Sequence, residues 1–534
     1  MKIMVKVKYL FIAFVFLTYN FAFGQSVEQE QLQKFQTFMR YVQLAYVDDV
    51  DSEKLTEDAI KAVLKGLDPH SVYISKKDLK KMNEPLEGNF EGVGIQFNIL
   101  HDTITVVSPI SGGPSKKLGI RAGDKIIEID DKVVAGVGFT NKDVADHLRG
   151  KKGTKVTVKI KRNGDSELLD FDIIRDKIPI YSMDAAYMAT QNTGYIKLNR
   201  FAAQSMKEVG NAIDSLNGLG MQNLILDLRG NGGGYLRTAI QLADNFLEPE
   251  KLIVYTQGKA FPREDYTSTK KGNFEKGKLV VLIDEGSASA SEIVTGAVQD
   301  WDRALVIGRK SFGKGLVQKP FQLSDGSAIR LTISRYYTPS GRSIQRDYSE
   351  GKEDYYNEIN KRFEHGELMN PDSIQFPDSL KYETLQLKRT VYGGGGIMPD
   401  IFIPLDTTET SKYFSSLIRK GVLYTYNLDY LDVHRDELLK QYPTFEDFNS
   451  NFELSDEMIE EIVVKAEEKG IERNPKELAH SKKILMLNFK ALMATNLWTS
   501  TEFYRVINVN DNTFNKALEV MDDKTFKKLK LDYK

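Results

Sequence analysis

Hydrophobic and polar residues follow one another along the chain in blocks that predict a multidomain α/β protein. Short apolar runs of strand length occur at 194–198, 223–228, 279–283 and 304–307. Segments with the apolar spacing of helices lie among them at 205–216, 236–246 and 292–300. We therefore assign an α/β core to residues 179–405, and we expect its polar, charged stretch 346–390 to be a surface insertion.

A smaller β-rich unit is expected over residues 86–178. Its predicted strands and helix are 103–107, 125–129, 155–162 and 141–148. Asn163-Gly164 is a strong signal for a two-residue hairpin turn after the last of these strands. This order of elements resembles a PDZ domain.

The resemblance to a PDZ domain assigns a peptide-binding role to the loop before the first strand. In such domains, backbone N–H groups bind a terminal carboxylate while the peptide adds to the sheet as a strand. The loop would be Gly92, Val93, Gly94 and Ile95, and a simple glycine turn is the alternative. The candidates for the apolar pocket are Ile95, Phe97, Val144 and Leu148.

Both ends of the chain show helical periodicity. Residues 25–85 form an N-terminal helical segment with a turn at Asp68–Tyr73, and residues 406–534 form a helical extension interrupted by Pro443 and Pro475. The N-terminal segment is either a lid on the core or a surface that packs protomers together. The charged runs of the extension fit solvated helix faces, with a substrate-tethering or partner-binding surface as the alternative.

Residues 1–24 have the features of a signal peptide. Lys2, Lys6 and Lys8 precede an apolar stretch at 9–23, and Ala22-Phe23-Gly24 is a small-x-small cleavage site. An uncleaved membrane anchor is the alternative, for which this apolar stretch is short. We expect cleavage and export to the periplasm or cell envelope of a bacterium.

The amino-acid composition limits the kinds of chemistry that the protein can perform. The chain of 534 residues is 41% hydrophobic and 28% charged, as in ordinary globular proteins. Its net charge of −2 gives no support for nucleic-acid binding. The absence of cysteine excludes thiol catalysis, disulfides and thiolate metal sites.

The candidate chemistry lies in the segment Leu279–Gln318. Ser289 stands in a run of small residues between a predicted strand and a predicted helix, where a hydroxyl is exposed beside free backbone N–H groups. Lys314 follows 25 residues later between two glycines, and Gln318 lies four residues beyond it. None of the six histidines lies in this segment, so Lys314 is the candidate base.

A lysine acts as a base near neutral pH only when burial keeps it uncharged, because an exposed lysine has a pKa near ~10.4. The amide of Gln318 is placed to hold that amine in line with Ser289. The plainer alternative is that Ser289-Ala-Ser-Glu292 forms a capping box, in which Ser289 only caps a helix.

These motifs together resemble the carboxyl-terminal processing (tail-specific) serine proteases. The hallmarks of that family are a Ser-Ala-Ser-Ala-Ser-Glu run, here residues 287–292, and an FGKGxxQ block, here residues 312–318. The resemblance covers roughly residues 40–405 and includes further matches at 227–234, 337–344 and 396–400. It implies a ββα (crotonase-like) core with Ser289 as nucleophile, Lys314 as base and Gln318 orienting Lys314.

The glycine run 230–234 completes the site that the resemblance implies. Gly233, or alternatively Gly232, would supply one N–H group of an oxyanion hole, and Ala290 would supply the other. A phosphate-binding loop is excluded because neither a G-K-[ST] ending nor a G-x-G-x-x-G spacing is present.

The resemblance implies an exported endopeptidase that recognises free C-terminal tails of envelope proteins and needs no metal or organic cofactor. Its partners would be protein or peptide substrates, an adaptor protein, and a second copy bound through the N-terminal or C-terminal helices. The alternatives are a non-catalytic peptide-binding scaffold and a crotonase-like acyl-CoA enzyme, which the PDZ unit and signal segment disfavour. Arg149, at the end of the predicted PDZ helix, would switch partners when a tail binds, unless it is only a surface charge.

Overall fold

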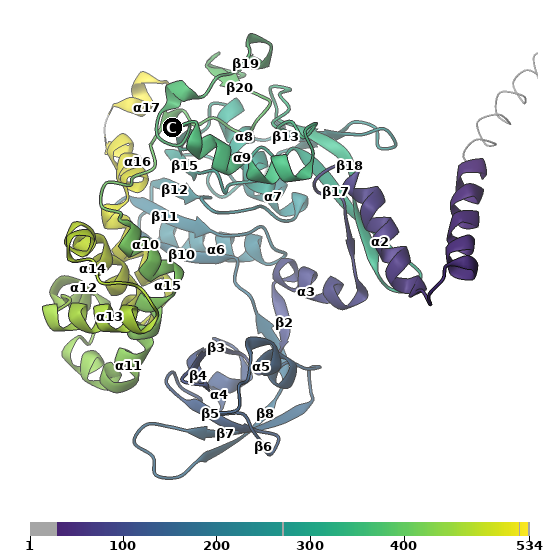
Figure 1. Ribbon diagram of the computed structural model, residues 1–534. Coiled ribbons are helices and arrows are strands. Elements are labelled where there is room, and N and C mark those ends of the chain that lie inside the picture. The colour runs from purple at the N-terminus through teal and green to yellow at the C-terminus, as the bar shows by residue number, and fades with distance from the viewer. Residues whose placement is uncertain (1–28, 270–271, 523, 532–534) are drawn as a thin grey trace, which may run out of the picture.

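The computed structural model describes residues 29–269, 272–522 and 524–531 (Figure 1), with no side chain described at position 522. The predicted signal peptide lies outside the described residues. Among the helices that are described, none has both the length and the apolar character needed to cross a membrane.

A six-stranded sheet forms the centre of the molecule. Its order is β10 (Met183–Met188), β11 (Thr193–Leu198), β12 (Asn223–Asp227), β15 (Leu279–Ile283), β16 (Leu305–Gly308) and β21 (Ile401–Phe402). All neighbours pair in parallel except β10 and β11. The strands predicted from apolar runs are thereby confirmed, because continuous apolar sequence is typical of parallel strands buried on both faces.

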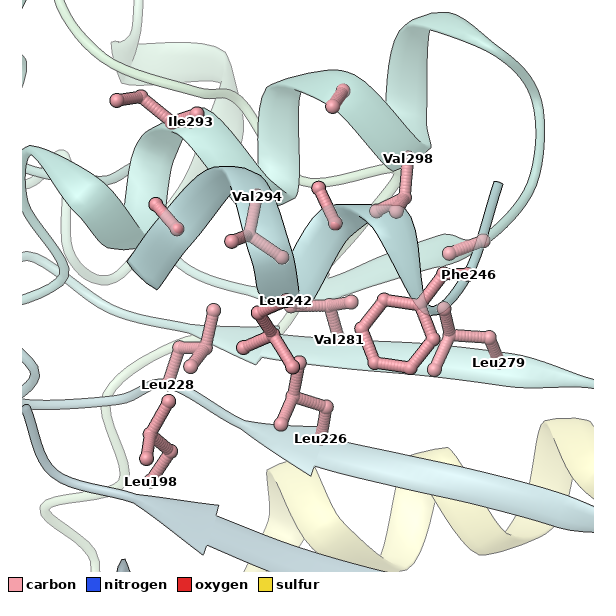
Figure 2. Close-up of a cluster of buried hydrophobic side chains, with 14 of the residues drawn as sticks. Leu198, Leu226, Leu228, Leu242, Phe246, Leu279, Val281, Ile293, Val294 and Val298 are labelled. Carbon is pink, nitrogen blue, oxygen red and sulfur yellow. The ribbon is translucent and has the colours of Figure 1, made fainter. Parts of the chain in front are cut away.

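Three helices cover one face of this sheet: α6 (Ser205–Gly218), α7 (Leu236–Asp244) and α8 (Ala290–Asp300). Figure 2 shows Leu226, Leu228 and Val281 of the sheet packed beneath side chains of α7 and α8. Every residue of α8 is buried, so the helix that begins beside Ser289 is held on all sides. Burial of each large apolar side chain contributes roughly 1.5–3 kcal/mol to stability.

The opposite face of the sheet is covered by the end of the chain. Phe514 and Met521 of α16 (Asn512–Asp522) and Phe526 of α17 (Thr525–Lys528) pack on Ile225 and Val280 of the sheet. The other helices of the C-terminal extension enclose an apolar core of their own. They are α10 (Lys412–Arg419), α11 (Val422–Gln441), α12 (Phe445–Asn451), α13 (Asp456–Glu468), α14 (Pro475–Leu497) and α15 (Ser500–Ile507). The predicted helical extension is confirmed, and its last helices are part of the core.

A second sheet contains β13 (Leu252–Gln257), β14 (Glu264–Thr267), β17 (Leu316–Gln322), β18 (Ala328–Tyr337) and β1 (Val72–Ile74). Strand β1 comes from the N-terminal segment and pairs with β18, with Val72 opposite Arg330. The predicted N-terminal helical segment is confirmed, and the predicted turn at Asp68–Tyr73 leads into β1, a strand that the sequence did not predict. The rest of that segment is helical at residues 29–45, α2 (Ser52–Lys65) and α3 (Lys76–Glu87).

The PDZ domain is a separate lobe that joins the core through a two-stranded neck (Figure 1). The neck consists of β2 (Asn89–Gly92) and β9 (Asp176–Pro179), paired antiparallel. The sheet of the lobe has the order β3 (Ile95–Leu100), β4 (Thr103–Pro109), β5 (Lys125–Ile129), β7 (Lys155–Lys161) and β8 (Leu169–Ile174), with β6 (Lys132–Val133) beside β5. Its helices are α4 (Pro114–Lys117) and α5 (Asn141–Leu148). Asn163-Gly164 lies in the connection between β7 and β8, as predicted, but this connection is the longer loop 162–168 and not a two-residue turn.

The expected surface insertion at 346–390 is instead partly buried. It contains α9 (Lys352–Glu364), β19 (Lys381–Glu383) and β20 (Thr390–Tyr392). The ring of Tyr355 is buried against Phe312, the first residue of the FGK block. The polar sequence of this segment suggested that it is exposed to solvent, but its buried Tyr355 ring covers the loop that carries Lys314.

Candidate active site

Ser289, Lys314 and Gln318 line one cavity of about 410 Å³. The glycine loop 232–234 and the start of α8 form one wall, and β17 and β18 form another. Helix α3 supplies the apolar side chains of Leu79, Met82 and Leu86. The structure therefore brings Ser289, Lys314 and Gln318 together with the glycine loop, as the sequence predicted. Gly233 and Gln318 are 85 positions apart in the sequence.

The strand-to-helix turn leaves Ser289 free while fixing its neighbours. Ser287 Oγ donates to the carbonyl of Leu228 and Ser291 Oγ donates to the carbonyl of Asn231, each at 2.8 Å. Ser289 alone of these serines lines the cavity. Its backbone has a φ of +56°, a strained conformation that costs roughly 1–3 kcal/mol and is typical of functional sites.

Glu292 is a buried carboxylate that joins the two halves of the site. Its oxygens accept from the backbone N–H groups of Ser289 (2.8 Å), Gly313 (2.7 Å) and Lys314 (2.9 Å) and from Ser311 Oγ (2.6 Å). Burial raises the pKa of Glu292 to about 7, and its donors oppose that rise. The sequence identified Glu292 only as part of a capping box; the bonds to residues 311–314 depend on the fold.

The amine of Lys314 is buried without an acidic partner. Its Nζ donates to Gln318 Oε1 at 3.0 Å, the only hydrogen bond of this amine among the described residues. Burial lowers the pKa of Lys314 to about 8, the charge of Arg330 lowers it further, and Glu292 and Asp68 act in the opposite direction. The uncharged form of Lys314 is thus far more abundant near neutral pH than that of an exposed lysine, as a general base requires.

Gln318 is held in turn by the N-terminal segment. Its Nε2 donates to the carbonyl of His70 at 2.5 Å. The ring of His70 lies 2.9 Å from the hydroxyl of Tyr355, and burial lowers the pKa of His70 to about 3. His70 therefore stays neutral. Its backbone carbonyl supports Gln318, whereas its ring contacts tyrosines and not Ser289. The turn at Asp68–Tyr73 was visible in the sequence, but this role was not.

The glycine loop lies directly against the serine turn. A Cβ at Gly233 would lie 2.8 Å from the carbonyl oxygen of Ala288 and 2.9 Å from Ser289 Cβ, and φ there is +100°. The N–H of Gly233 donates to Asn231 Oδ1 at 2.9 Å. Among the described residues, no acceptor faces the N–H groups of Ala290 and Gly232. The oxyanion-hole assignment stays a prediction, and Gly232 is the loop donor that is free in this structure.

The PDZ loop presents backbone donors at the edge of its sheet. The N–H groups of Val93 and Gly94 have no acceptor among the described residues, while the carbonyl of Val93 is held by Ser115 Oγ at 2.7 Å. Strand β3 pairs only with β4 and leaves its other edge open. Of the predicted pocket residues, Ile95 and Phe97 are partly buried on β3, whereas Val144 and Leu148 are enclosed in the core of the lobe.

Arg149 connects the PDZ lobe to the cavity wall. It ends α5, and its guanidinium donates to Glu84 Oε2 of α3 at 2.5 Å and lies 4.6 Å from the ring centre of Phe90. Residues of α3 on either side of Glu84 line the catalytic cavity. Arg149 is therefore bonded to the element that connects the lobe with the active site.

Four family descriptions match parts of the chain. Peptidase family S41 matches residues 192–353, PDZ domain matches 92–173, and "Activating protease CtpB N-terminal domain" matches 20–78. A family of unknown function, DUF8443, matches 413–499 in the C-terminal extension.

Curated relatives carry related names. The Carboxy-terminal-processing protease of Bartonella bacilliformis is 39% identical over 355 residues, which are 64% of this chain and 81% of the relative. The Carboxy-terminal processing protease CtpA of Bacillus subtilis is 37% identical over 302 residues, which are 56% of this chain and 64% of the relative. Among solved structures, the photosystem II D1 C-terminal processing protease is 27% identical, covering 69% of this chain and 86% of that chain with a TM-score of 0.35.

Proposed function

Because the chain belongs to the carboxy-terminal processing proteases of peptidase family S41, we propose that it cleaves peptide bonds with a Ser289–Lys314 dyad. One observation carries this proposal: the partly exposed serine of a strained turn and a buried lysine without an acidic partner line the same cavity. The bond from Lys314 Nζ to Gln318 holds the amine in that cavity. A protein that only binds peptides would not require a lysine whose pKa is lowered toward neutral pH.

The proposed reaction has two halves. Uncharged Lys314 takes the proton of Ser289 Oγ as this oxygen attacks the substrate carbonyl, and backbone N–H groups of the glycine loop and Ala290 bind the resulting oxyanion. Lys314 then gives the proton to the leaving amine, and an acyl-enzyme remains on Ser289. Water attacks the acyl carbon, with Lys314 again as base, and releases the acid. The bond to Gln318 uses an N–H of Lys314, so the lone pair of the uncharged amine stays free to accept the proton of Ser289.

The PDZ lobe would deliver the substrate. The free N–H groups of Val93 and Gly94 would bind the terminal carboxylate, and the tail would add to the open edge of β3. The tails would belong to envelope proteins if the predicted signal peptide directs export. The separate lobe and its two-stranded neck allow the tail to be held while the upstream chain enters the cavity.

Self-association is proposed for the helix at residues 29–45. Its apolar side chains are exposed, with Leu32 at 60%, Phe38 at 56% and Leu44 at 73%. Figure 1 shows this helix standing away from the core, which favours a contact between copies over a lid. An adaptor protein would find exposed apolar side chains at Val433 and Val464 of the extension. Serine substitutions at Leu32 and Phe38 should lower the mass measured by light scattering; an unchanged mass would reject the contact.

The dyad is tested by substitution. Ser289→Ala and Lys314→Ala should each lower kcat by a factor on the order of 10⁴ or more, and the double variant should be little worse, because the two groups act as a unit. Lys314→Arg should be as inactive as Lys314→Ala, because a guanidinium does not lose its proton near neutral pH. Substantial turnover by Lys314→Arg would exclude lysine as the base.

Matched serines provide the control. Ser287→Ala and Ser291→Ala remove hydroxyls of the same run that bond backbone carbonyls outside the cavity, so they should retain far more activity. A serine-directed acylating probe should label the wild type at Ser289. A folded wild type that neither labels nor cleaves any peptide would support the alternative of a peptide-binding scaffold.

A further inference from the structure

The catalytic cavity contains a charged side chain that the reaction above does not use. Arg330, on β18, lines the cavity together with Ser289, Lys314 and Gln318. It lies opposite Val72 of β1 and Pro320 of β17, so strands on both sides fix its position. Its side chain is only partly accessible to solvent.

Arg330 has no partner of its own among the described residues. Its guanidinium makes neither a hydrogen bond nor an ion pair there, and its Nε is fully buried without an acceptor. Two other partly buried arginines are paired, Arg309 with Glu285 at 2.7 Å and Arg389 with Asp302 at 2.7 Å. Arg200 also has a buried Nε without an acceptor among the described residues, but it does not line the catalytic cavity, as Arg330 does. Since a buried donor without an acceptor is destabilising, folding alone gives no reason for this arrangement.

We propose that Arg330 is a substrate-binding residue that takes a carboxylate of the peptide inside the catalytic cavity. The proposal rests on the proposed function, because it assumes that this cavity holds the substrate. A guanidinium presents a planar fork of donors that matches a carboxylate, and charge-assisted bonds of this kind are strong. The carboxylate is either an acidic side chain close to the scissile bond or the terminal carboxylate of a short tail.

The charge of Arg330 also acts on the base. The charged groups around Lys314 are Arg330, which lowers its pKa, and Glu292 and Asp68, which raise it, while His70 stays neutral. A substrate carboxylate bound to Arg330 would offset the positive charge and raise the pKa of Lys314. The limb of the kcat profile that rises with pH should then lie at higher pH for a substrate with a carboxylate than for a neutral twin.

The test uses internally quenched peptides in matched pairs on the full-length protein. In the first arm, amidated peptides differ only by Glu or Gln at one position, which is moved across the residues flanking the cleavage site. Amidation removes the group that the PDZ loop would bind, so any preference arises in the cavity. In the second arm, peptides with termini close to the cleavage site differ only as free acid or amide.

The wild type should prefer the carboxylate peptide of at least one pair, mainly through KM. Arg330→Gln should reduce that preference by about tenfold to a hundredfold, the range expected for hydrogen bonds to a charged group. It should raise the KM of the carboxylate peptide far more than that of the neutral twin, with both measured above the pH midpoint of each variant. Arg330→Lys should retain part of the preference, because the charge remains and the fork is lost. If Arg330→Gln loses the preference only in the first arm, the ligand of Arg330 is an acidic side chain. If it loses the preference only in the second arm, the ligand is the terminal carboxylate.

Arg335→Gln is the matched control, since Arg335 is exposed on the same strand and does not line the cavity. It should leave the preference as in the wild type. Because Arg330 has no ionic partner among the described residues, its substitution leaves no buried acid unpaired. Titration with the acylating probe gives the fraction of active protein for each variant. The proposal would be overturned by a wild type that cleaves both members of every pair equally. It would also be overturned by an Arg330→Gln variant whose KM rises equally for both members. Absence of cleavage by the wild type would instead reject the proposed function.

Discussion

Two regions of this molecule are suited to a peptide carboxyl group, and they are built in different ways. The PDZ loop offers the N–H groups of Val93 and Gly94, which have no acceptor among the described residues. In the catalytic site, Lys314 and Arg330 line the cavity and Glu292 is buried beside it, and the charges of Arg330 and Glu292 shift the pKa of Lys314 in opposite directions. The first site depends on backbone shape, and the second depends on burial and on the balance of charges.

The difference predicts how each region responds to substitution. In the loop, a side chain can change without effect unless it disturbs the backbone. In the cavity, removal of one charge changes the protonation of its neighbours, because Coulomb interactions are strong where water is excluded. The predictions below address this contrast, beginning with the largest expected effect.

Glu292→Ala should lower kcat by roughly 10²–10³, comparable to the loss of a preorganised donor at an active site. Glu292 accepts from three backbone N–H groups that position both Ser289 and Lys314, so its removal loosens both halves of the dyad. The rate of acylating-probe labelling should fall with kcat. Glu285→Gln, which alters an acid that bonds Arg309 and does not line the cavity, is the control. A near-normal kcat in Glu292→Ala would show that the turn holds its geometry unaided.

The pH profile should report the lysine. The active form of Lys314 is uncharged, so kcat/KM should rise about tenfold per pH unit below a midpoint near pH 8 and level off above it. Because Glu292 raises the pKa of Lys314 and Arg330 lowers it, Glu292→Gln should move the midpoint to lower pH and Arg330→Gln to higher pH. A profile that stays flat from about pH 5 to 9 would contradict a lysine base.

The sequence predicted the members of the site better than their supports. Ser289, Lys314 and Gln318 lie at fixed spacing in one segment, so a local motif can reveal them. His70 reaches Gln318 and Arg330 reaches the cavity through the pairing of β18 with β1 and β17, and no local pattern encodes that pairing. The strand β1 itself was missed because it has only three residues within a helical region.

The PDZ lobe shows the same limit. Its strands and α5 follow from short-range periodicity and turn chemistry, and they were predicted closely. Val144 and Leu148 were predicted as pocket residues from the resemblance to a PDZ domain; the structure encloses both in the core of the lobe, and their contact with a bound tail stays a prediction. Periodicity identifies the apolar face of a helix and does not say which neighbour covers it.

Amidation of a protein tail should weaken cleavage by about tenfold, because the backbone donors of the loop lose a charged acceptor. The effect should appear in KM and vanish for short peptides that do not reach the PDZ lobe. A peptide comparison is the better test than a bulky residue at Gly94, since φ there is +78° and a Cβ would lie 2.9 Å from Ile178 Cδ1. Equal cleavage of acid and amide protein tails would remove the loop from recognition.

The smallest effect concerns communication between the two regions. Arg149 and Glu84 join α5 to the helix that lines the cavity, but the Arg149 side chain is 43% exposed, so the pair contributes only about 0–1 kcal/mol. A ligand shifts such an equilibrium only by its differential affinity for the two states. A non-cleavable tail peptide added in trans should therefore change cleavage of a separate short reporter by no more than about fivefold. Arg149→Ala should abolish that change without altering tail binding, while Lys151→Ala, a lysine of the same loop, should preserve it. If saturating tail peptide leaves reporter cleavage unchanged in the wild type, the PDZ lobe holds the substrate without acting on the cavity.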